Sequence, residues 1–342
     1  MMFTGAVILC VWLIGCDDDN RYITGPVIPK DYVVYVSWDY PWPTVTTYNT
    51  GTGTIDSFHT PYVASAPPSL SADGRLMYFG SQTTAVIELD SYTTVMELPY
   101  DGRSGVVASP DNQLVAIQSE ELYILNTADF SVAYHDTTRL VNGQFSADSR
   151  NFYCCHPYGD TSFVVKINVK DSTSSWKAFP GEIVQLVIPT NDEQKLLMQF
   201  WATIYPVLKI YDVGADSVLF TDTIPDGWED SELTPNGRYL LITHRGNPYS
   251  VNPSPLAIRV YDVWQNQLHK IISTSVTDVP GTPHYLDYHV YDLCLTPDGR
   301  LGVGTTRTDY LVLIDMQQME MTGIVQLDTM WSYTRATCQL IP

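Results

Sequence analysis

The sequence predicts an all-β protein that is built from repeated four-stranded sheets. One turn phrase returns six times: Ser or Thr, then Ala, Asn or Pro, then Asp or Asn, then Gly or a polar residue, with a short apolar run on each side. The copies begin 38, 37, 44, 44 and 62 residues apart, at Ser71, Ser109, Ser146, Thr190, Thr234 and Thr296. A period near 40 residues with about four short strands per unit is typical of a β-propeller.

Four apolar runs make up each unit, and we letter them A to D from the axis of the propeller to its rim. Strand A precedes each phrase and is expected at 68–70, 106–108, 143–145, 184–188, 232–233 and 293–295. Strand B follows each phrase and is expected at 76–79, 114–117, 152–153, 196–198, 239–243 and 301–303. Strand C is expected at 85–89, 122–125, 163–167, 207–211, 257–261 and 310–314. Strand D is expected at 95–98, 130–134, near 176, and at 217–220, 268–272 and 323–327.

The turns between strands C and D share a polar first residue. An aspartate follows several C strands, at Asp90, Asp212, Asp262 and Asp315. An aspartate side chain in this position favours an Asx-type hairpin, in which its carboxylate accepts hydrogen bonds from the turn backbone.

A seventh blade is predicted from the two ends of the domain. The run 337–341 looks like a strand A with nothing after it, and the runs 33–36, 44–48 and 55–58 look like strands B, C and D. Together they complete one blade, and this closure protects the sheet edges. The sequence therefore predicts a seven-bladed β-propeller over residues 31–342.

The turn phrases resemble those of the YVTN-type and lactonase-like seven-bladed propellers. The resemblance is carried by Ser-Pro-Asp-Asn-Gln-Leu at 109–114, Thr-Pro-Asn-Gly-Arg-Tyr at 234–239 and Thr-Pro-Asp-Gly-Arg-Leu at 296–301, and it covers nearly the whole mature chain. It implies the fold. It does not imply one activity, because such propellers host binders, scaffolds and several enzymes.

The N-terminus predicts export and a lipid anchor. Residues 1–15 carry no charged side chain, and their apolar core is too short to span a bilayer as a stable helix. Leu13-Ile14-Gly15-Cys16 resembles the bacterial lipobox, which implies that Cys16 becomes the lipidated first residue of the mature protein. The usual Lys or Arg near the start is missing, and an ordinary cleaved signal with an unrelated cysteine is the alternative.

A tether and an envelope location follow from this reading. Residues 16–30 begin with Cys-Asp-Asp-Asp-Asn and read as an acidic extended tether to the propeller. We expect a lipid-anchored protein of the cell envelope, at the outer membrane or the cell surface. Aspartates after the cysteine resemble a surface-export signal in some bacteria and an inner-membrane retention signal in others. The sequence therefore does not decide which membrane leaflet holds the anchor.

Charge argues against one class of partner. The chain has 38 acidic and 18 basic residues and a net charge of −20. Nucleic-acid binding depends on Lys and Arg, so we expect no nucleic-acid partner. The acidity serves solubility or attracts a cation or a basic partner.

The predicted loop face is where a function is expected. Strand alternation places the B–C and D–A connections on one face of the disc and the A–B and C–D turns on the other. The two long insertions, 244–253 and 277–288, both belong to that loop face, and long loops in compact folds usually carry function. Aromatic residues gather in the same connections and predict a ligand-binding surface: Trp38, Trp42, Trp201, Trp228, Tyr249, Tyr285 and Trp331. Each of them could instead cap a blade.

A catalytic site is the alternative for the same face. The candidates are His244, His284, Asp287 and His289, which could form an acid–base or divalent-cation site. Their spacing matches no metal motif, and no Gly-rich phosphate loop or serine nucleophile elbow is present. We therefore predict no metal site and no cofactor.

Four cysteines remain in the mature domain besides Cys16. Cys294 and Cys338 fall on innermost strands of adjacent predicted blades, where a disulfide could form, although we expect buried thiols. The leading functional hypothesis is a recognition module for a protein or a glycan, and the alternative is a lactonase-like hydrolase or lyase.

Overall fold

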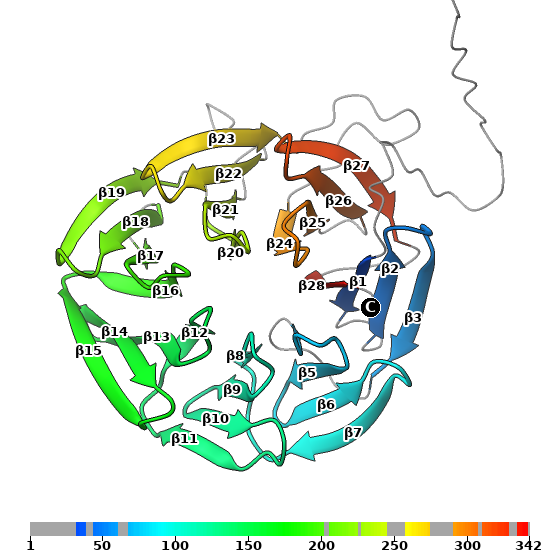
Figure 1. The fold of residues 1–342 in the computed structure, drawn as a ribbon, viewed down its shortest axis with the longest axis horizontal. Coiled ribbons are helices and arrows are strands. Elements are labelled where there is room, and N and C mark those ends of the chain that lie inside the picture. Colours follow the sequence, from blue (N-terminus) through cyan, green and yellow to red (C-terminus); the bar gives the residue numbers. More distant parts are fainter. Residues whose placement is uncertain are drawn as a thin grey trace, which may run out of the picture.

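The computed structural model describes residues 32–38, 44–60, 68–201, 205–224, 227–244, 257–273, 290–306, 310–327 and 334–340 of the chain. Their strands form seven four-stranded antiparallel sheets arranged in a ring around an axis (Figure 1). The predicted seven-bladed β-propeller is confirmed. The predicted segments 1–15 and 16–30, with Cys16, lie outside the described residues.

Strands A to D of each blade follow one another in the chain. Blade one contains β4 (Ser69–Leu70), β5 (Leu76–Gly80), β6 (Thr84–Glu88) and β7 (Thr93–Leu98). Blade two contains β8 (Gly105–Ala108), β9 (Leu114–Gln118), β10 (Leu122–Asn126) and β11 (Val132–Asp136). Blade three contains β12 (Val141–Phe145), β13 (Asn151–Tyr158), β14 (Thr161–Asn168) and β15 (Thr173–Pro180).

The second half of the ring repeats this order. Blade four contains β16 (Ile183–Pro189), β17 (Lys195–Trp201), β18 (Val207–Asp212) and β19 (Ser217–Thr223). Blade five contains β20 (Ser231–Leu233), β21 (Tyr239–His244), β22 (Ala257–Asp262) and β23 (Gln267–Ser273). Blade six contains β24 (Val290–Leu295), β25 (Leu301–Thr306), β26 (Tyr310–Asp315) and β27 (Glu320–Gln326).

Blade seven closes the ring with strands from both ends of the domain. The C-terminal strand β28 (Thr334–Leu340) is its strand A and pairs antiparallel with β1 (Tyr32–Trp38). Strands β2 (Thr44–Asn49) and β3 (Ile55–His59) complete the sheet. This is the closure that the sequence predicts, and it joins residues that lie some 300 positions apart in the chain.

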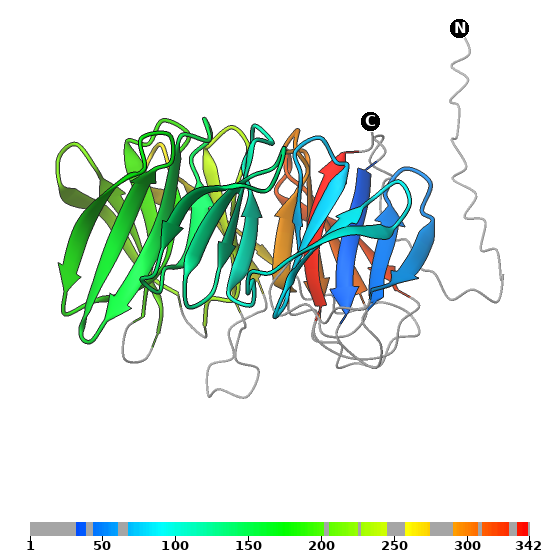
Figure 2. The same ribbon diagram turned by 90° about the horizontal axis from the view of Figure 1, so that it is seen from below.

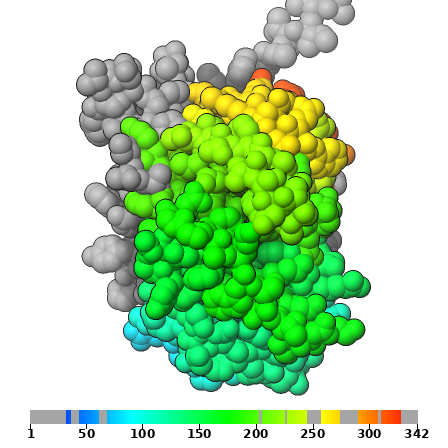
Figure 3. Space-filling view, turned by 90° about the vertical axis from the view of Figure 1, so that its left-hand side faces the viewer, coloured from blue at the N-terminus to red at the C-terminus, as the bar shows by residue number. Residues whose placement is uncertain are grey.

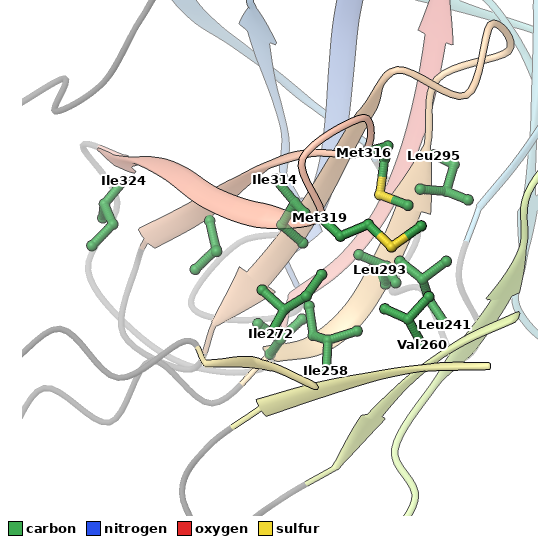
Figure 4. Close-up of a cluster of buried hydrophobic side chains, with 12 residues drawn as sticks. Leu241, Ile258, Val260, Ile272, Leu293, Leu295, Ile314, Met316, Met319 and Ile324 are labelled. Atoms are coloured by element: carbon green, nitrogen blue, oxygen red, sulfur yellow. The ribbon is translucent and has the colours of Figure 1, made fainter. Parts of the chain in front are cut away.

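The core is divided among the interfaces between neighbouring blades. Seven clusters of buried apolar side chains occur among the described residues, and each combines residues of two adjacent blades. Figure 4 shows the cluster between blades five and six, where Ile258 and Val260 of β22 meet Leu293 of β24 and Ile314 of β26. Burial of such side chains removes apolar surface from water and holds the blades together.

The turn phrases form one repeated hydrogen-bonded structure. The Ser or Thr hydroxyl donates to the Asp or Asn two residues later and accepts the backbone N–H five residues later. In the phrase of Ser146, the hydroxyl lies 2.7 Å from Asp148 Oδ1 and 3.0 Å from the N of Asn151. The equivalent pairs are Ser71–Asp73, Ser109–Asp111, Thr190–Asp192, Thr234–Asn236 and Thr296–Asp298.

The C–D hairpins are confirmed as Asx turns in three of the four expected places. Asp212, Asp262 and Asp315 accept backbone N–H groups of their own turns. The prediction for Asp90 is wrong, because β6 ends two residues earlier, at Glu88, and Glu88 takes the place that the aspartates occupy in the other blades.

The strands run between two faces of a disc (Figure 2). The A–B and C–D turns lie on one, which we call the turn face, and the B–C and D–A connections lie on the other, the loop face. The D strands form the rim, and Figure 3 looks onto the rim of blades three to five, where β15, β19 and β23 expose most of their side chains. No helix among the described residues is long and apolar enough to cross a membrane.

Candidate aromatic ledge on the loop face

Blade three extends beyond blade two at the loop face. Strands β13, β14 and β15 have eight residues each, whereas β9, β10 and β11 have five. Both B strands begin five residues after the Ser of their turn phrases, so their turn-face ends are aligned. The extra residues His156, Pro157 and Tyr158 therefore lie at the loop-face end of β13.

Four rings share the side of blade three that faces blade two. In the sheet register, His156 lies opposite Phe163, and Trp176 lies opposite Val165, two residues along from Phe163. Because side chains alternate along a strand, His156, Tyr158, Phe163 and Trp176 project from one surface of the sheet. Cys154, two residues before His156, packs in the core between blades two and three, which identifies the side.

The ring of His156 lies against the other three, and two of the four rings are exposed to solvent. The ring centroid of His156 lies 6.0 Å from Tyr158, 6.1 Å from Phe163 and 5.6 Å from Trp176. Tyr158 is 71% exposed and Trp176 is 42% exposed, whereas His156 and Phe163 are partly buried. We call these four residues the aromatic ledge. Strand β9 ends level with Cys155, so blade two does not reach His156 and Tyr158, and Trp176 is exposed because β15 is the rim strand.

The histidine of the ledge is held in place by the backbone. His156 Nδ1 lies 2.9 Å from the carbonyl oxygen of Arg139, in the connection between blades two and three. Since a carbonyl accepts, Nδ1 is the donor of this bond, and Nε2 takes no part in it. The ledge thus combines aromatic faces with a polar atom.

Blade four adds exposed apolar side chains to the same face of the disc. Trp201, the last residue of β17, is 57% exposed and lies opposite Ile183 of β16. Tyr205, in the following B–C connection, is exposed as well. Trp201, one of the predicted binding residues, is therefore exposed to solvent on the loop face.

The other predicted binding residues have different placements. Trp38 is the last residue of β1, where the structure describes the backbone only. Trp228 is partly buried and packs against the core between blades four and five, and its indole N–H has no acceptor in the described part of the chain. Four predicted residues lie outside the described residues: Trp42, Tyr249, Tyr285 and Trp331.

The predicted catalytic set is not assembled by the described residues. His244 ends β21 and is 4% exposed. His284, Asp287 and His289 lie outside the described residues. Among the described residues, no group of three or more His, Cys, Asp or Glu side chains is arranged to hold a metal ion.

One cysteine expectation needs correction. Cys294, on β24, is disulfide-bonded and is not the buried thiol that we expected. Cys154 and Cys155 are free thiols, and burial raises the pKa of both above the usual value of a cysteine. Strand β28, which carries Cys338, packs beside β24. A bond to Cys338 is the alternative that the sequence leaves open.

Comparison with known proteins identifies the fold alone. No family model and no curated protein matches the chain. A structure of hydrazine synthase from Kuenenia stuttgartiensis is similar at a TM-score of 0.61 and 13% identity, over 78% of this chain and 88% of that one. The β-propeller domain of Cps50 (Swd1) from Myceliophteria thermophila is similar at a TM-score of 0.57 and 13% identity, over 78% of this chain and 88% of that one. Dihydro-heme d1 dehydrogenase NirN in complex with DHE is similar at a TM-score of 0.59 and 16% identity, over 90% of this chain and 77% of that one. These proteins differ in function, so the likeness carries no activity to this chain.

Proposed function

We propose that this protein is a lipid-anchored protein of the cell envelope whose propeller recognises a carbohydrate through its loop face. The observation that carries the proposal is the aromatic ledge. Tyr158 stands open to solvent where blade three extends past blade two, and Trp176 stands open beside it on the rim strand β15. Large exposed aromatic side chains that gather on one face mark a recognition surface.

The chemistry of the ledge favours a sugar. Its exposed members are aromatic, and a ring face carries negative charge that attracts the polarised C–H groups of a pyranose. The centroid of the His156 ring lies within 6.1 Å of those of the other three rings, and the exposed carboxylate of Asp160 follows Tyr158 in the chain. Sugars present flat apolar faces with hydroxyl groups at their edges, and this combination of groups matches them.

The net charge restricts the class of glycan. A chain with a net charge of −20 repels polyanions at low ionic strength. We therefore expect a neutral or basic polysaccharide, and no sulfated or uronic-acid-rich one.

The lipid anchor rests on the resemblance of residues 13–16 to the lipobox. Two or three acyl chains on Cys16 would hold the protein firmly at a membrane, since one chain alone gives marginal binding. A mass measurement of the mature N-terminal peptide tests this. A diacylglyceryl-modified Cys16 supports the anchor, and an unmodified N-terminus created by cleavage elsewhere contradicts it.

A glycan array tests recognition. The full-length protein in detergent is compared with the variant Tyr158→Ala/Trp176→Ala and with Trp264→Ala, a control in which a Trp that is 63% exposed at a turn-face hairpin is removed. We expect binding to a neutral or basic glycan that is lost in the double variant and kept in the control. Binding to no glycan, or equal binding by both variants, contradicts the proposal, even if a protein partner is then found.

A further inference from the structure

A cavity of about 540 Å³ lies on the axis of the ring, in the size range of ligand pockets. It is lined by the A strands of blades one to six, β4, β8, β12, β16, β20 and β24. Strand A is the innermost strand of every blade, so one of its edges has no pairing strand. The backbone N–H and C=O groups of these edges need partners inside the cavity.

Most polar side chains in the wall of the cavity bind neighbouring blades. Ser69 Oγ accepts the N–H of Ala108 at 2.9 Å, and Gln118 Oε1 accepts the N–H of Gly143 at 2.8 Å. Asn142 Nδ2 donates to the carbonyl oxygen of Gln185 at 2.6 Å. These bonds fix the wall on the side of blades one to four and leave those side chains occupied.

The opposite side of the cavity is acidic. Asp230 and Glu232 belong to blade five, and Asp292 belongs to blade six. Asp230 Oδ2 accepts the N–H of Leu293 at 2.8 Å, which joins the two blades. No Lys or Arg is among the described residues that line the cavity. Of the A strands, only β28 of blade seven, beside β24, carries a basic residue, Arg335.

Two side chains at this side have unused hydrogen-bonding capacity. The carboxyl of Glu232 makes no hydrogen bond or ion pair with any part of the chain that the structure describes. Ser231, which lines the same cavity and is 3% exposed, has a hydroxyl without a hydrogen-bond partner. The buried hydroxyl of Ser231 costs free energy while it has no partner, and a ligand that binds to it and to the partly buried carboxyl of Glu232 recovers that cost.

We propose that this axial cavity is a binding site for a small organic cation, held by ion pairs and hydrogen bonds to Glu232, Asp230 and Asp292. The carboxylates come from two blades and are not clustered as metal ligands within the described residues. A flexible ammonium compound can reach separated carboxyl groups, whereas a metal ion needs them converging on one point. The polar, uncharged side chains of blades one to four would face the rest of the ligand.

The site is expected to respond to pH through Glu232. Burial, and next the charge of Asp230, raise the pKa of Glu232 to about 8. Besides Glu232, the charged side chains among the described residues that line the cavity are Asp230 and Asp292. A cation favours the ionised carboxylate, so Glu232 must lose a proton when the ligand binds near neutral pH. Affinity therefore rises from pH 6.5 to pH 8.5.

Isothermal titration of the full-length protein in detergent with spermidine tests the site. We expect one binding event per chain that is roughly tenfold or more tighter at pH 8.5 than at pH 6.5, since the binding-competent ionised fraction grows with pH. Proton release should appear as a dependence of the measured heat on the ionisation enthalpy of the buffer.

Variants separate the cavity from other acidic surfaces. Glu232→Gln should weaken binding at pH 8.5 and abolish its pH dependence, and Asp171→Asn, which removes an exposed carboxylate from a turn-face hairpin, should leave both unchanged. Since Gln resembles the protonated Glu, thermal unfolding at pH 7 should show a folded variant. The proposal is overturned if spermidine does not bind at either pH, if Glu232→Gln binds like the wild type, or if a divalent cation binds where spermidine does not. The variant Tyr158→Ala/Trp176→Ala should keep this affinity, so the result is independent of the aromatic ledge.

Discussion

Ser149, in the turn phrase of blade three, accepts a hydrogen bond on Oγ from the backbone N of Asp111 in blade two, at 3.1 Å. Ser149 has a φ of 61°, in the left-handed region that disfavours residues other than glycine. The equivalent residue Asn112, with a φ of 63°, accepts the N–H of Ala72 in blade one through Oδ1, at 2.5 Å. At both strained positions, the side chain accepts a hydrogen bond from the backbone of the preceding blade and so links the two blades.

The glycines at the same position have a different environment. A Cβ on Gly237 would lie 2.9 Å from Cγ of Asn191, and a Cβ on Gly299 would lie 3.2 Å from Cδ of Pro235. The preceding turn phrase therefore packs over the glycine, and Asn191 itself donates to the carbonyl oxygen of Pro235. Each turn-face junction from blade one to blade six uses either a bridging side chain or a glycine against which the neighbouring phrase packs.

The hydrogen bond between Asp111 N and Ser149 Oγ predicts an order of stability among variants of Ser149. Ser149→Ala loses the bond to blade two and keeps the left-handed backbone, so it should lower the free energy of unfolding by about 1 kcal/mol. Ser149→Gly loses the same bond but relieves about 1 kcal/mol of backbone strain, so it should be less destabilising than the Ala variant. Urea unfolding measures both. A Gly variant less stable than the Ala variant would contradict the assignment.

Gly237→Ala should be more damaging than either change at Ser149. It places a Cβ in the left-handed backbone region and against Asn191. Strain of this kind costs about 1–3 kcal/mol. The same urea titration measures it, and an Ala variant as stable as the wild type would mean that the turn phrases of blades four and five do not pack as described.

Glu193 joins blades three and four and should make stability depend on pH. Although burial raises the pKa of Glu193, hydrogen bonds from Lys166, Tyr153 and Asn151 outweigh it and hold the pKa below its usual value. A depressed pKa contributes stability that is present above the unfolded-state pKa, about 4.3, and is lost as the pH falls through the folded value. Urea unfolding of the wild type and of Glu193→Gln at pH 7 and pH 3 measures this. The wild-type advantage should be present at pH 7 and shrink at pH 3, and an advantage that grows toward acid would contradict it.

The disulfide of Cys294 should survive mild reductant in the folded protein and stabilise the ring. Removing a native disulfide typically costs about 2–5 kcal/mol, so Cys294→Ala should unfold at a lower temperature than the wild type. A digest without reductant should contain a linked peptide that joins Cys294 to Cys338, while Cys154 and Cys155 react with an alkylating reagent only after unfolding. A Cys294 that is alkylated in the unfolded, unreduced protein would contradict the bond.

The fold could be predicted because its determinants are local. Ser146, Asp148 and the N–H of Asn151 form a closed set of hydrogen bonds within six residues, and a phrase of that kind can be recognised wherever it returns. The closing blade followed from the same repeat, because the leftover strands had the right number and order. At Asp90 the expectation failed because the hairpin of blade one begins at Glu88, which is not an Asx residue.

The aromatic ledge could not be predicted, because it depends on the relative length of two blades. Strand B of blade three was expected at 152–153 and runs to Tyr158, past Pro157, a residue that normally marks the end of a strand. Nor does the sequence show that Glu232 lines the axis, since strand A is too short there to reveal which side chains face the cavity. Both features arise where blades meet, and the sequence of one repeat does not show how its blade packs against the next one.

Recognition by the aromatic ledge is tested by the affinity of the full-length protein for the best glycan of the array, measured by titration of its tryptophan fluorescence. Trp176 is an exposed member of the ledge, so ligand binding should change the emission of the wild type and of Trp264→Ala in the same way. Tyr158→Ala should weaken the affinity by about tenfold or more, as expected for a stacking residue worth more than 1 kcal/mol. A Tyr158→Ala variant with wild-type affinity, or a loss of affinity in Trp264→Ala instead, would show that the ledge is not the recognition surface.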